Sequence, residues 1–166
     1  LVREIIGGLL NTTDWNLGLM MLEESSRITG RSLMSLAANK PLHLPTTEAT
    51  DEEIKAAFDA TLGLDRIYML DHFGSTGIEN IVARARYFAK ALDCKAIFLD
   101  HVSIVVSSQE NGDERKALDA IMTRLRTLAQ ELGITIFLVS HLKRPDGTAH
   151  EEGGKTSLAQ LRGSAS

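Results

Sequence analysis

The chain has 166 residues, of which 43% are hydrophobic and 24% are charged, and its formal net charge is −4 at pH 7. These values are typical of one soluble globular domain that buries a substantial core. The acidic balance argues against a strongly basic coat for nucleic acid, so DNA contact is expected only where Lys and Arg cluster locally. No apolar run is long enough to span a membrane, and the single cysteine, Cys94, excludes an internal disulfide and favours a cytoplasmic setting.

Helical and strand-like patterns alternate along the chain. A helix that begins with the capping box of Thr50 and Glu53 is expected to end at Gly63. Its expected apolar face consists of Ile54, Ala57, Phe58 and Leu62. Other helices are expected near residues 1–10, 25–38, 81–92 and 118–132, and strands near 17–22, 66–70, 96–99 and 134–140. Repeated strand–helix–strand units require crossover connections, so the predicted fold is α/β, with a mostly parallel central sheet and helices on both faces.

Three of the predicted strands are apolar runs that end in a polar residue. Glu23 and Glu24 follow the first strand, Asp100 follows the strand at 96–99, and His141 follows the last strand. Ligands of open α/β sheets bind outside the carboxyl ends of the strands. Glu23, Asp100 and His141 are therefore expected to line one crevice, although they lie far apart in the sequence.

Each of these residues has a chemical interpretation and a plainer structural one. Asp100 either positions Mg²⁺, which takes few protein carboxylates together with waters and phosphate oxygens, or merely caps the following turn. Glu23 or Glu24 polarises a water for attack on a phosphoryl group, or both are solvated residues in the first turn of the next helix. His141 donates a hydrogen bond to a phosphate, or is satisfied by a backbone carbonyl.

The tripeptide at residues 70–72 is a near copy of the one at residues 99–101, since both read Leu-Asp-His. Only the second follows a longer, strictly apolar strand that leads on to the strand of His141. Asp71 is therefore expected to have a structural role in a turn. The histidines have no metal-ligand spacing, so a zinc site is not expected.

Six short motifs, in order along the chain, resemble those of RecA-fold replicative helicases. They are MLEES at 21–25, FLDHVSIVVS at 98–107, DERK at 113–116, SHLKRPD at 140–146, AHEEG at 149–153 and LRGS at 161–164. The chain most resembles the helicase domain of phage helicase–primase proteins, which are related to mitochondrial Twinkle and more distantly to bacterial DnaB. The resemblance covers almost the whole chain.

This resemblance implies an ATP-dependent, ring-forming helicase that translocates on single-stranded DNA and unwinds duplex, with ATP or dTTP as substrate and Mg²⁺ as cofactor. By the same resemblance, Glu23 activates the hydrolytic water and Asp100 is the Walker B residue, which serves Mg²⁺ through water. His141 senses the γ-phosphate and links it to the DNA-binding loop that follows.

That loop covers about residues 143–155, where Lys143 is the best-matched DNA contact and Arg144 and Lys155 are looser candidates. Arg162 begins the next motif, which in the family belongs to the DNA-side and intersubunit machinery. The implied partners are single-stranded DNA, further copies of the chain in a ring, expected to be a hexamer, and a primase domain and replicative polymerase. The implied location is the cytoplasm of a phage-infected bacterial host, with no membrane partner.

Two departures from the family pattern qualify this expectation. The phosphate loop, G-x-x-x-x-G-K-[ST], is absent from the sequence, and by resemblance it lies just upstream, with the arginine finger downstream. Residues 1–166 are therefore expected to be a partial RecA-like helicase ATPase domain, truncated at both ends and inactive in isolation. The loop at 143–155 carries as many acids as cations, so each subunit is expected to hold DNA modestly.

Two other classes of function fit parts of the sequence. A RecA-like protein that binds DNA or mediates recombination without hydrolysis would also lack the phosphate loop. An unrelated α/β hydrolase would use a carboxylate and a histidine, but the sequence contains no nucleophile elbow.

Overall fold

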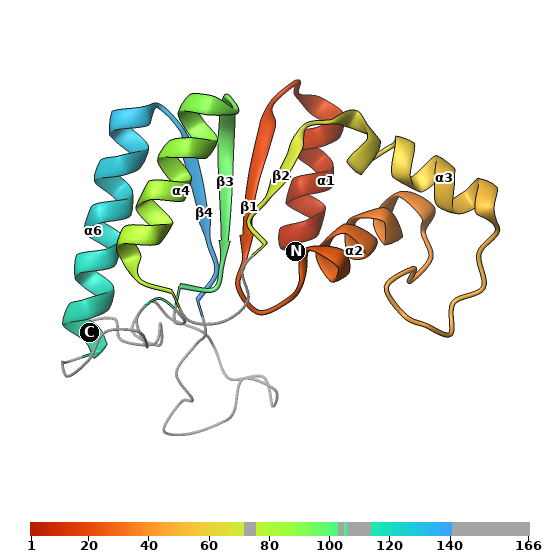
Figure 1. The fold of residues 1–166 in the computed structure, drawn as a ribbon, viewed down its shortest axis with the longest axis horizontal. Helices are drawn as coiled ribbons and strands as arrows, with labels where there is room; N and C mark the ends of the chain where they lie inside the picture. Colours follow the sequence, from red (N-terminus) through yellow and green to blue (C-terminus); the bar gives the residue numbers. More distant parts are fainter. Residues whose placement is uncertain (72–75, 103–104, 106–113, 141–166) are drawn as a thin grey trace.

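A computed structural model of the protein describes residues 1–71, 76–102, 105 and 114–140 (Figure 1). In chain order, its elements are α1 (Val2–Thr12), β1 (Asn16–Met21), α2 (Ser26–Ala38), α3 (Asp51–Asp59), the 3₁₀ helix η1 (Leu62–Leu64), β2 (Ile67–Met69), α4 (Ile78–Ala91), β3 (Cys94–Asp100), α6 (Glu114–Leu132) and β4 (Thr135–Leu138). Apart from the consecutive helices α2, α3 and η1, helices and strands alternate as predicted. None of the helices within the described residues is long and apolar enough to cross a membrane.

The described strands form one sheet in the order β2-β1-β3-β4, and every neighbouring pair is parallel. Leu19 in β1 is opposite Phe98 in β3, and Phe98 is opposite Phe137 in β4. The rings of Phe98 and Phe137 stack with their centroids 4.5 Å apart. Because all the strands run in the same direction, their carboxyl ends meet at one edge of the sheet, the lower edge in Figure 1.

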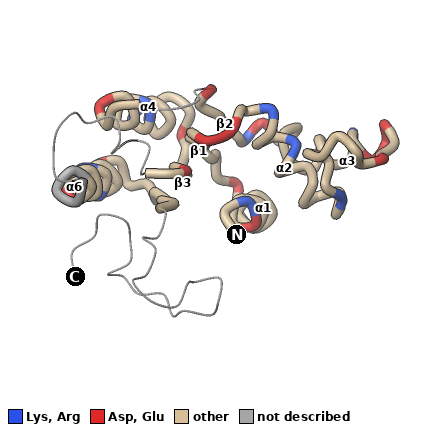
Figure 2. Tube along the Cα trace, turned by 90° about the horizontal axis from the view of Figure 1, so that it is seen from below, with Lys and Arg blue, Asp and Glu red and all other residues tan. Residues whose placement is uncertain are grey.

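Helices cover both faces of this sheet, as Figure 2 shows from the lower edge. Successive residues of β1 point to opposite sides, so Leu19 and Met21 pack with α1 and α2, while Met20 and Leu22 pack with α4 and α6. A strand that is buried on both faces needs apolar residues at every position, which explains the continuous apolar run. The predicted α/β fold with a parallel central sheet is confirmed.

The helix after Thr50 differs from the prediction in its end and in its buried face. Its capping box is present, but α3 ends at Asp59, before Gly63. Only Ala57 of the expected apolar face is buried within the helix, whereas Ile54 is 37% exposed and Phe58 is 45% exposed. The reason is that α3 packs on α2 through a small cluster of its own and does not reach the sheet (Figure 1).

Cys94 is the first residue of β3 and is buried, as expected of a small core residue. Burial, helped by the charge of Asp93, raises the pKa of the Cys94 thiol to about 11. The reactive form of cysteine is the thiolate, so this thiol is inert at neutral pH.

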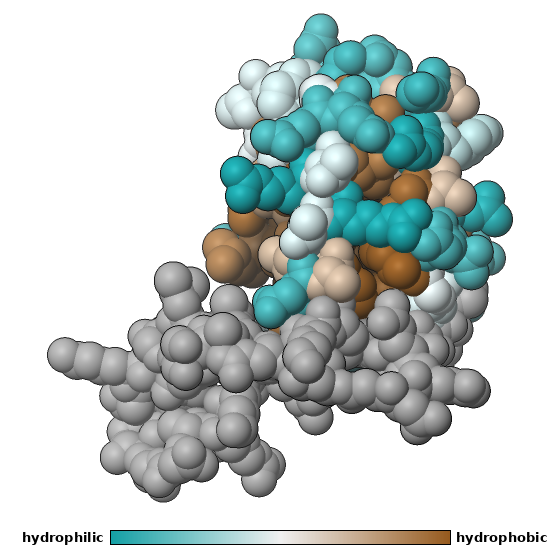
Figure 3. All heavy atoms as spheres, turned by 90° about the vertical axis from the view of Figure 1, so that its left-hand side faces the viewer, coloured by the Kyte–Doolittle hydropathy of each residue, from teal (hydrophilic) through white to brown (hydrophobic). Residues whose placement is uncertain are grey.

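The outer face of α6 is largely hydrophilic, with apolar side chains showing between the polar ones (Figure 3). Among the described residues, two ion pairs join α6 to α4: Arg86 with Glu131 and Arg124 with Glu79. Exposed ion pairs contribute at most about 1 kcal/mol each. The apolar inner faces of the two helices, which include Phe88 and Leu125, therefore hold them on the sheet.

Gly18 in β1 is a position where only a residue without a side chain fits. A Cβ atom at Gly18 would lie 2.5 Å from Cδ2 of Phe88, which packs directly on the strand. We expect Gly18→Ala to lower the free energy of unfolding by about 1–3 kcal/mol through overpacking, as measured by urea denaturation. Gly8→Ala on the exposed side of α1 is the matched control, because nothing beyond its chain neighbours and its own helix backbone lies within 4 Å of its Cβ position. The control is expected to stabilise by about 0.4–1 kcal/mol, and equal effects of the two variants would contradict the prediction.

Candidate active site

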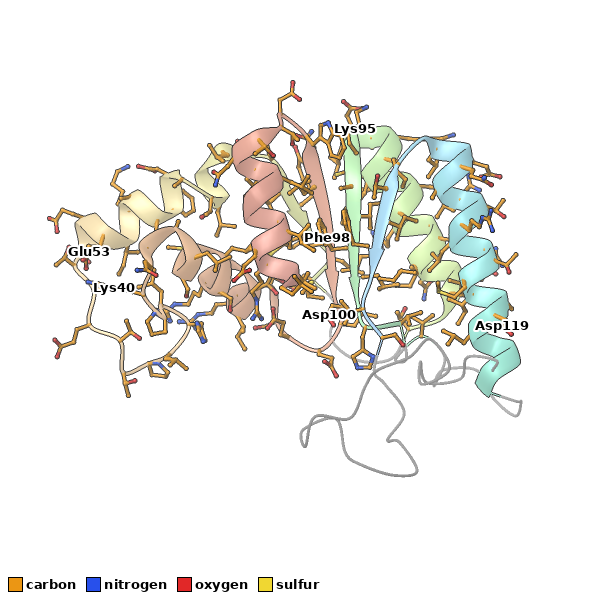
Figure 4. The ribbon with its side chains drawn as sticks, turned by 180° about the vertical axis from the view of Figure 1, so that it is seen from behind. Lys40, Glu53, Lys95, Phe98, Asp100 and Asp119 are labelled. Atoms are coloured by element: carbon orange, nitrogen blue, oxygen red, sulfur yellow. The ribbon has the colours of Figure 1, made fainter. Side chains whose placement is uncertain are left out.

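The carboxyl ends of β1 and β3 are joined directly by backbone pairing. Met21 lies opposite Asp100, and the N–H of Leu22 donates a hydrogen bond to the carbonyl oxygen of Asp100 at 2.6 Å. Figure 4 shows Asp100 at this edge of the sheet, two residues beyond the buried Phe98. The residues that follow each strand are therefore held close to one another.

Glu23 and His101 meet at this edge. Nε2 of His101 lies 2.6 Å from Oε1 of Glu23. The imidazole is buried, with 6% of His101 exposed, whereas 52% of the Glu23 side chain is exposed. The peptide bond between Asp100 and His101 is cis. Sequence reasoning did not select His101 as a site residue, although its place one residue beyond a strand end was a signal that could have found it.

Glu24 has different partners from those of Glu23. One oxygen of its carboxylate lies 2.7 Å from the Arg3 guanidinium, and the other accepts a hydrogen bond from the Thr29 hydroxyl at 2.8 Å. Neither glutamate lies in the first turn of α2, because that helix begins at Ser26 after the N-cap Ser25. Glu24 thus ties β1 to α1 and α2, while Glu23 lies beside the end of β3.

Asp100 is a half-buried carboxylate at the end of β3. Burial raises the pKa of the Asp100 carboxyl, and the charge of Glu23 raises it further; His101, Glu24 and Arg3 have smaller effects. Within the part of the chain that the structure describes, no hydrogen bond to the Asp100 side chain is present. A nearby cation would relieve the repulsion between these carboxylates.

The residues at this edge suit Mg²⁺ better than a metal held only by protein ligands. No group of three or more His, Cys, Asp or Glu side chains among the described residues is arranged to hold a metal ion. Mg²⁺ binds through one or two carboxylates, several waters and substrate phosphates. Asp100, with Glu23 close by, provides that kind of incomplete ligand set.

A cavity of about 270 Å³ adjoins Asp100 and is lined by Leu1, Val2, Arg3 and Met21. It lies at the amino end of α1, which is marked N in Figure 1. The amino end of a helix attracts anions because its backbone N–H groups and dipole point toward them. The Arg3 guanidinium at this end is paired with Glu24, so the attraction for a phosphate beside Asp100 comes from the helix end.

The remaining predicted site residues, His141, Lys143, Arg144, Lys155 and Arg162, lie outside the described residues. The last described residues before His141 lie beside the end of β3. Val139 donates a backbone hydrogen bond to Leu99 and accepts one from Val102, at 3.0 Å and 2.9 Å. Val139, two residues before His141, therefore lies next to the end of β3.

Asp71, the aspartate in the near copy of the Asp100 motif, has a structural contact. Its carboxylate accepts a hydrogen bond from the hydroxyl of Ser26 at 2.6 Å, which links the chain after β2 to the start of α2. This contact agrees with the structural role expected for Asp71. The turn expected before Gly74 and Ser75 falls on residues outside the described ones.

The sequence matches the family of DnaB-like helicase C-terminal domains over residues 3–166. The chain belongs to this family. It is also 38% identical, over 154 residues, to a DNA helicase/primase of Enterobacteria phage T3. That match covers 89% of this chain and 27% of the phage protein, so the chain spans about a quarter of its relative.

Two solved structures have the same fold. One is an ATPase domain, which superposes with a TM-score of 0.76 at 17% sequence identity, over 98% of this chain and 58% of that one. The other is a DnaB-like replicative helicase, described with its interactions with primase, which superposes with a TM-score of 0.72 at 18% identity, over 92% of this chain and 38% of that one. These likenesses confirm the RecA-like fold expected from the sequence motifs.

Proposed function

We propose that this DnaB-like helicase domain hydrolyses a nucleoside triphosphate at the edge formed by β1 and β3, as part of a replicative DNA helicase that translocates on single-stranded DNA. Residues 1–166 form part of its RecA-like ATPase domain. The observation that carries the proposal is the strand pairing of Met21 with Asp100, which brings Glu23 close to the Asp100 carboxylate at the carboxyl edge of the sheet. Family membership and the likeness to a phage helicase/primase support this reaction class.

The chemistry divides between the two carboxylates. Asp100 would hold Mg²⁺ through water, and the bound cation would supply charge neutralisation at the phosphates of ATP or dTTP. Glu23 is half exposed, so a water in front of the γ-phosphate can reach its carboxylate, which accepts the proton as that water attacks phosphorus. The bond from phosphorus to the bridging oxygen then breaks, which releases the diphosphate and inorganic phosphate. His141 contacts the γ-phosphate in this scheme, as its sequence motif implies.

The partners follow from the same proposal. Copies of the chain assemble into a homo-oligomeric ring, expected to be a hexamer, around single-stranded DNA. Lys143, with Arg144 and Lys155, contacts the DNA backbone, and Arg162 begins the motif that serves the DNA side and the subunit interface. A primase domain and a replicative polymerase act alongside the ring in the cytoplasm of an infected host cell.

The DNA-binding part of the proposal is tested with Lys143→Ala in the full-length protein. Loss of one phosphate contact is expected to weaken binding of single-stranded DNA by roughly tenfold for all sequences, and to reduce the salt slope of binding by about one ion. Lys95→Ala is the matched control, because Lys95 lies at the edge of the sheet opposite to that of Asp100 (Figure 4).

Fluorescence anisotropy at several salt concentrations measures both quantities, and strand displacement on forked DNA measures unwinding. Equal binding by the Lys143 and Lys95 variants would remove Lys143 from the interface. DNA binding by the full-length protein without nucleotide turnover would instead favour a non-hydrolysing, recombination-mediator function.

A further inference from the structure

His101 is a buried side chain that contacts the glutamate assigned to water activation. Its Nε2 atom lies 2.6 Å from Oε1 of Glu23, and only 6% of the residue is exposed. An ionised carboxylate can only accept hydrogen bonds, so the imidazole N–H at Nε2 is the donor. The hydrogen bond therefore connects a fixed ring to a side chain that is half in solvent.

The position of the imidazole is set by its surroundings in the sheet. The backbone on its two sides is anchored: the carbonyl of Asp100 accepts from Leu22 of the β1 end, and the N–H of Val102 donates to Val139 after β4. Val102 itself is 1% exposed. A ring buried between such anchors has little freedom to move, whereas a glutamate at an exposed edge has three side-chain torsions to restrict.

The two consecutive glutamates are thus held by separate groups. Arg3 and Thr29 hold Glu24 on the side of α1 and α2. His101 holds Glu23 on the side of β3, where the Glu23 charge raises the pKa of Asp100. Without His101, Glu23 would lose a buried hydrogen-bond partner at the carboxyl edge of the sheet.

We propose that His101 is a positioning residue, which holds the Glu23 carboxylate at the place where it activates water. The inference rests on the proposed role of Glu23 in hydrolysis. Because a misplacement of about 1 Å of a catalytic group can cost about 10²-fold in rate, loss of this hydrogen bond is expected to lower kcat by about 10- to 100-fold. The KM for nucleotide is expected to change little, since His101 acts through Glu23 and not on the bound phosphates.

The test compares His101→Asn with His101→Gln in the full-length protein. The glutamine amide extends to about the depth of Nε2 and retains a donor for Glu23, whereas the asparagine amide stops at the depth of Nδ1. We expect the asparagine variant to show the loss of kcat and the glutamine variant to recover most of it. Melting temperature and nucleotide affinity, measured on both, separate this effect from a folding defect, and His101→Leu serves as a third variant if the asparagine protein does not fold.

A double-mutant cycle then distinguishes positioning from an independent role. In single-turnover assays with labelled nucleotide, adding His101→Asn to Glu23→Gln is expected to change the residual rate by less than about twofold. The reason is that Glu23→Gln has already removed the carboxylate that His101 positions. Multiplication of the two losses, or an unchanged kcat for His101→Asn alone, would overturn the inference while leaving the role of Glu23 intact. Full turnover by Glu23→Gln alone would instead overturn the proposed role of Glu23 itself.

Discussion

Replacement of Glu23 by glutamine in the full-length protein is expected to reduce nucleotide turnover by about 10²- to 10⁴-fold, the range that positioned general bases contribute. The amide keeps the size of the side chain and its contact with His101, but it does not accept a proton from the attacking water. Nucleotide affinity is expected to stay close to that of the unmodified protein, because Glu23 contacts the water and not the phosphates. Steady-state hydrolysis and equilibrium binding of a fluorescent nucleotide measure the two quantities.

The neighbouring glutamate supplies the matched control. Glu24→Gln removes the charge that pairs with Arg3 but leaves Glu23 beside His101. This variant is expected to lose about 1 kcal/mol or less of stability and to keep turnover within about tenfold of the unmodified protein. A larger loss of turnover for Glu24→Gln than for Glu23→Gln would mean that the two roles are exchanged.

Replacement of Asp100 by asparagine is expected to reduce turnover strongly and, at the same time, to stabilise the fold. Loss of the carboxylate that serves Mg²⁺ is expected to lower turnover by at least about 10²-fold, since the cation is the main source of charge stabilisation in phosphoryl transfer. Higher Mg²⁺ concentrations are expected to recover only part of the loss. Mg²⁺ titrations of hydrolysis by the full-length protein test this half of the prediction.

The stabilising half follows from the raised pKa of Asp100. Burial and the charge of Glu23 raise the pKa of the Asp100 carboxyl in the fold above its value in the unfolded chain. The folded protein therefore binds this proton more tightly, and ionisation of Asp100 costs folding free energy. That cost is absent below the ordinary pKa, grows as the pH rises through the window between the ordinary and the raised pKa, and is complete above it.

Asparagine removes this cost because it does not ionise. In the presence of a chelator, Asp100→Asn is expected to melt at a higher temperature than the unmodified protein at pH 8, and the difference is expected to shrink as the pH falls toward about 4. Asp119→Asn, on the exposed side of α6, is the control (Figure 4). A lower melting temperature for Asp100→Asn at pH 8 would show that other interactions in the fold stabilise the ionised Asp100 carboxylate by more than its burial costs.

Most of the fold was predictable because its signals are local. The apolar runs of β1 and β3 and the capping box at Thr50 are patterns of adjacent residues, and each indicates its element without reference to distant parts of the chain. The end of α3 was predicted wrongly. Whether Ile54 and Phe58 are covered depends on what packs against the helix, and α3 meets only the small cluster on α2.

The sequence by itself also predicted that Glu23, Asp100 and His141 lie at one edge of the sheet, because residues after parallel strands meet there. The first two lie in the described residues and are at that edge. Only the tertiary structure decided which neighbours they have. The register that sets Met21 opposite Asp100 brings His101 to Glu23, and the position of α1 brings Arg3 to Glu24. The register of a strand and the docking of a helix depend on contacts between segments far apart in the chain. The sequence alone therefore does not show that two adjacent glutamates have different partners.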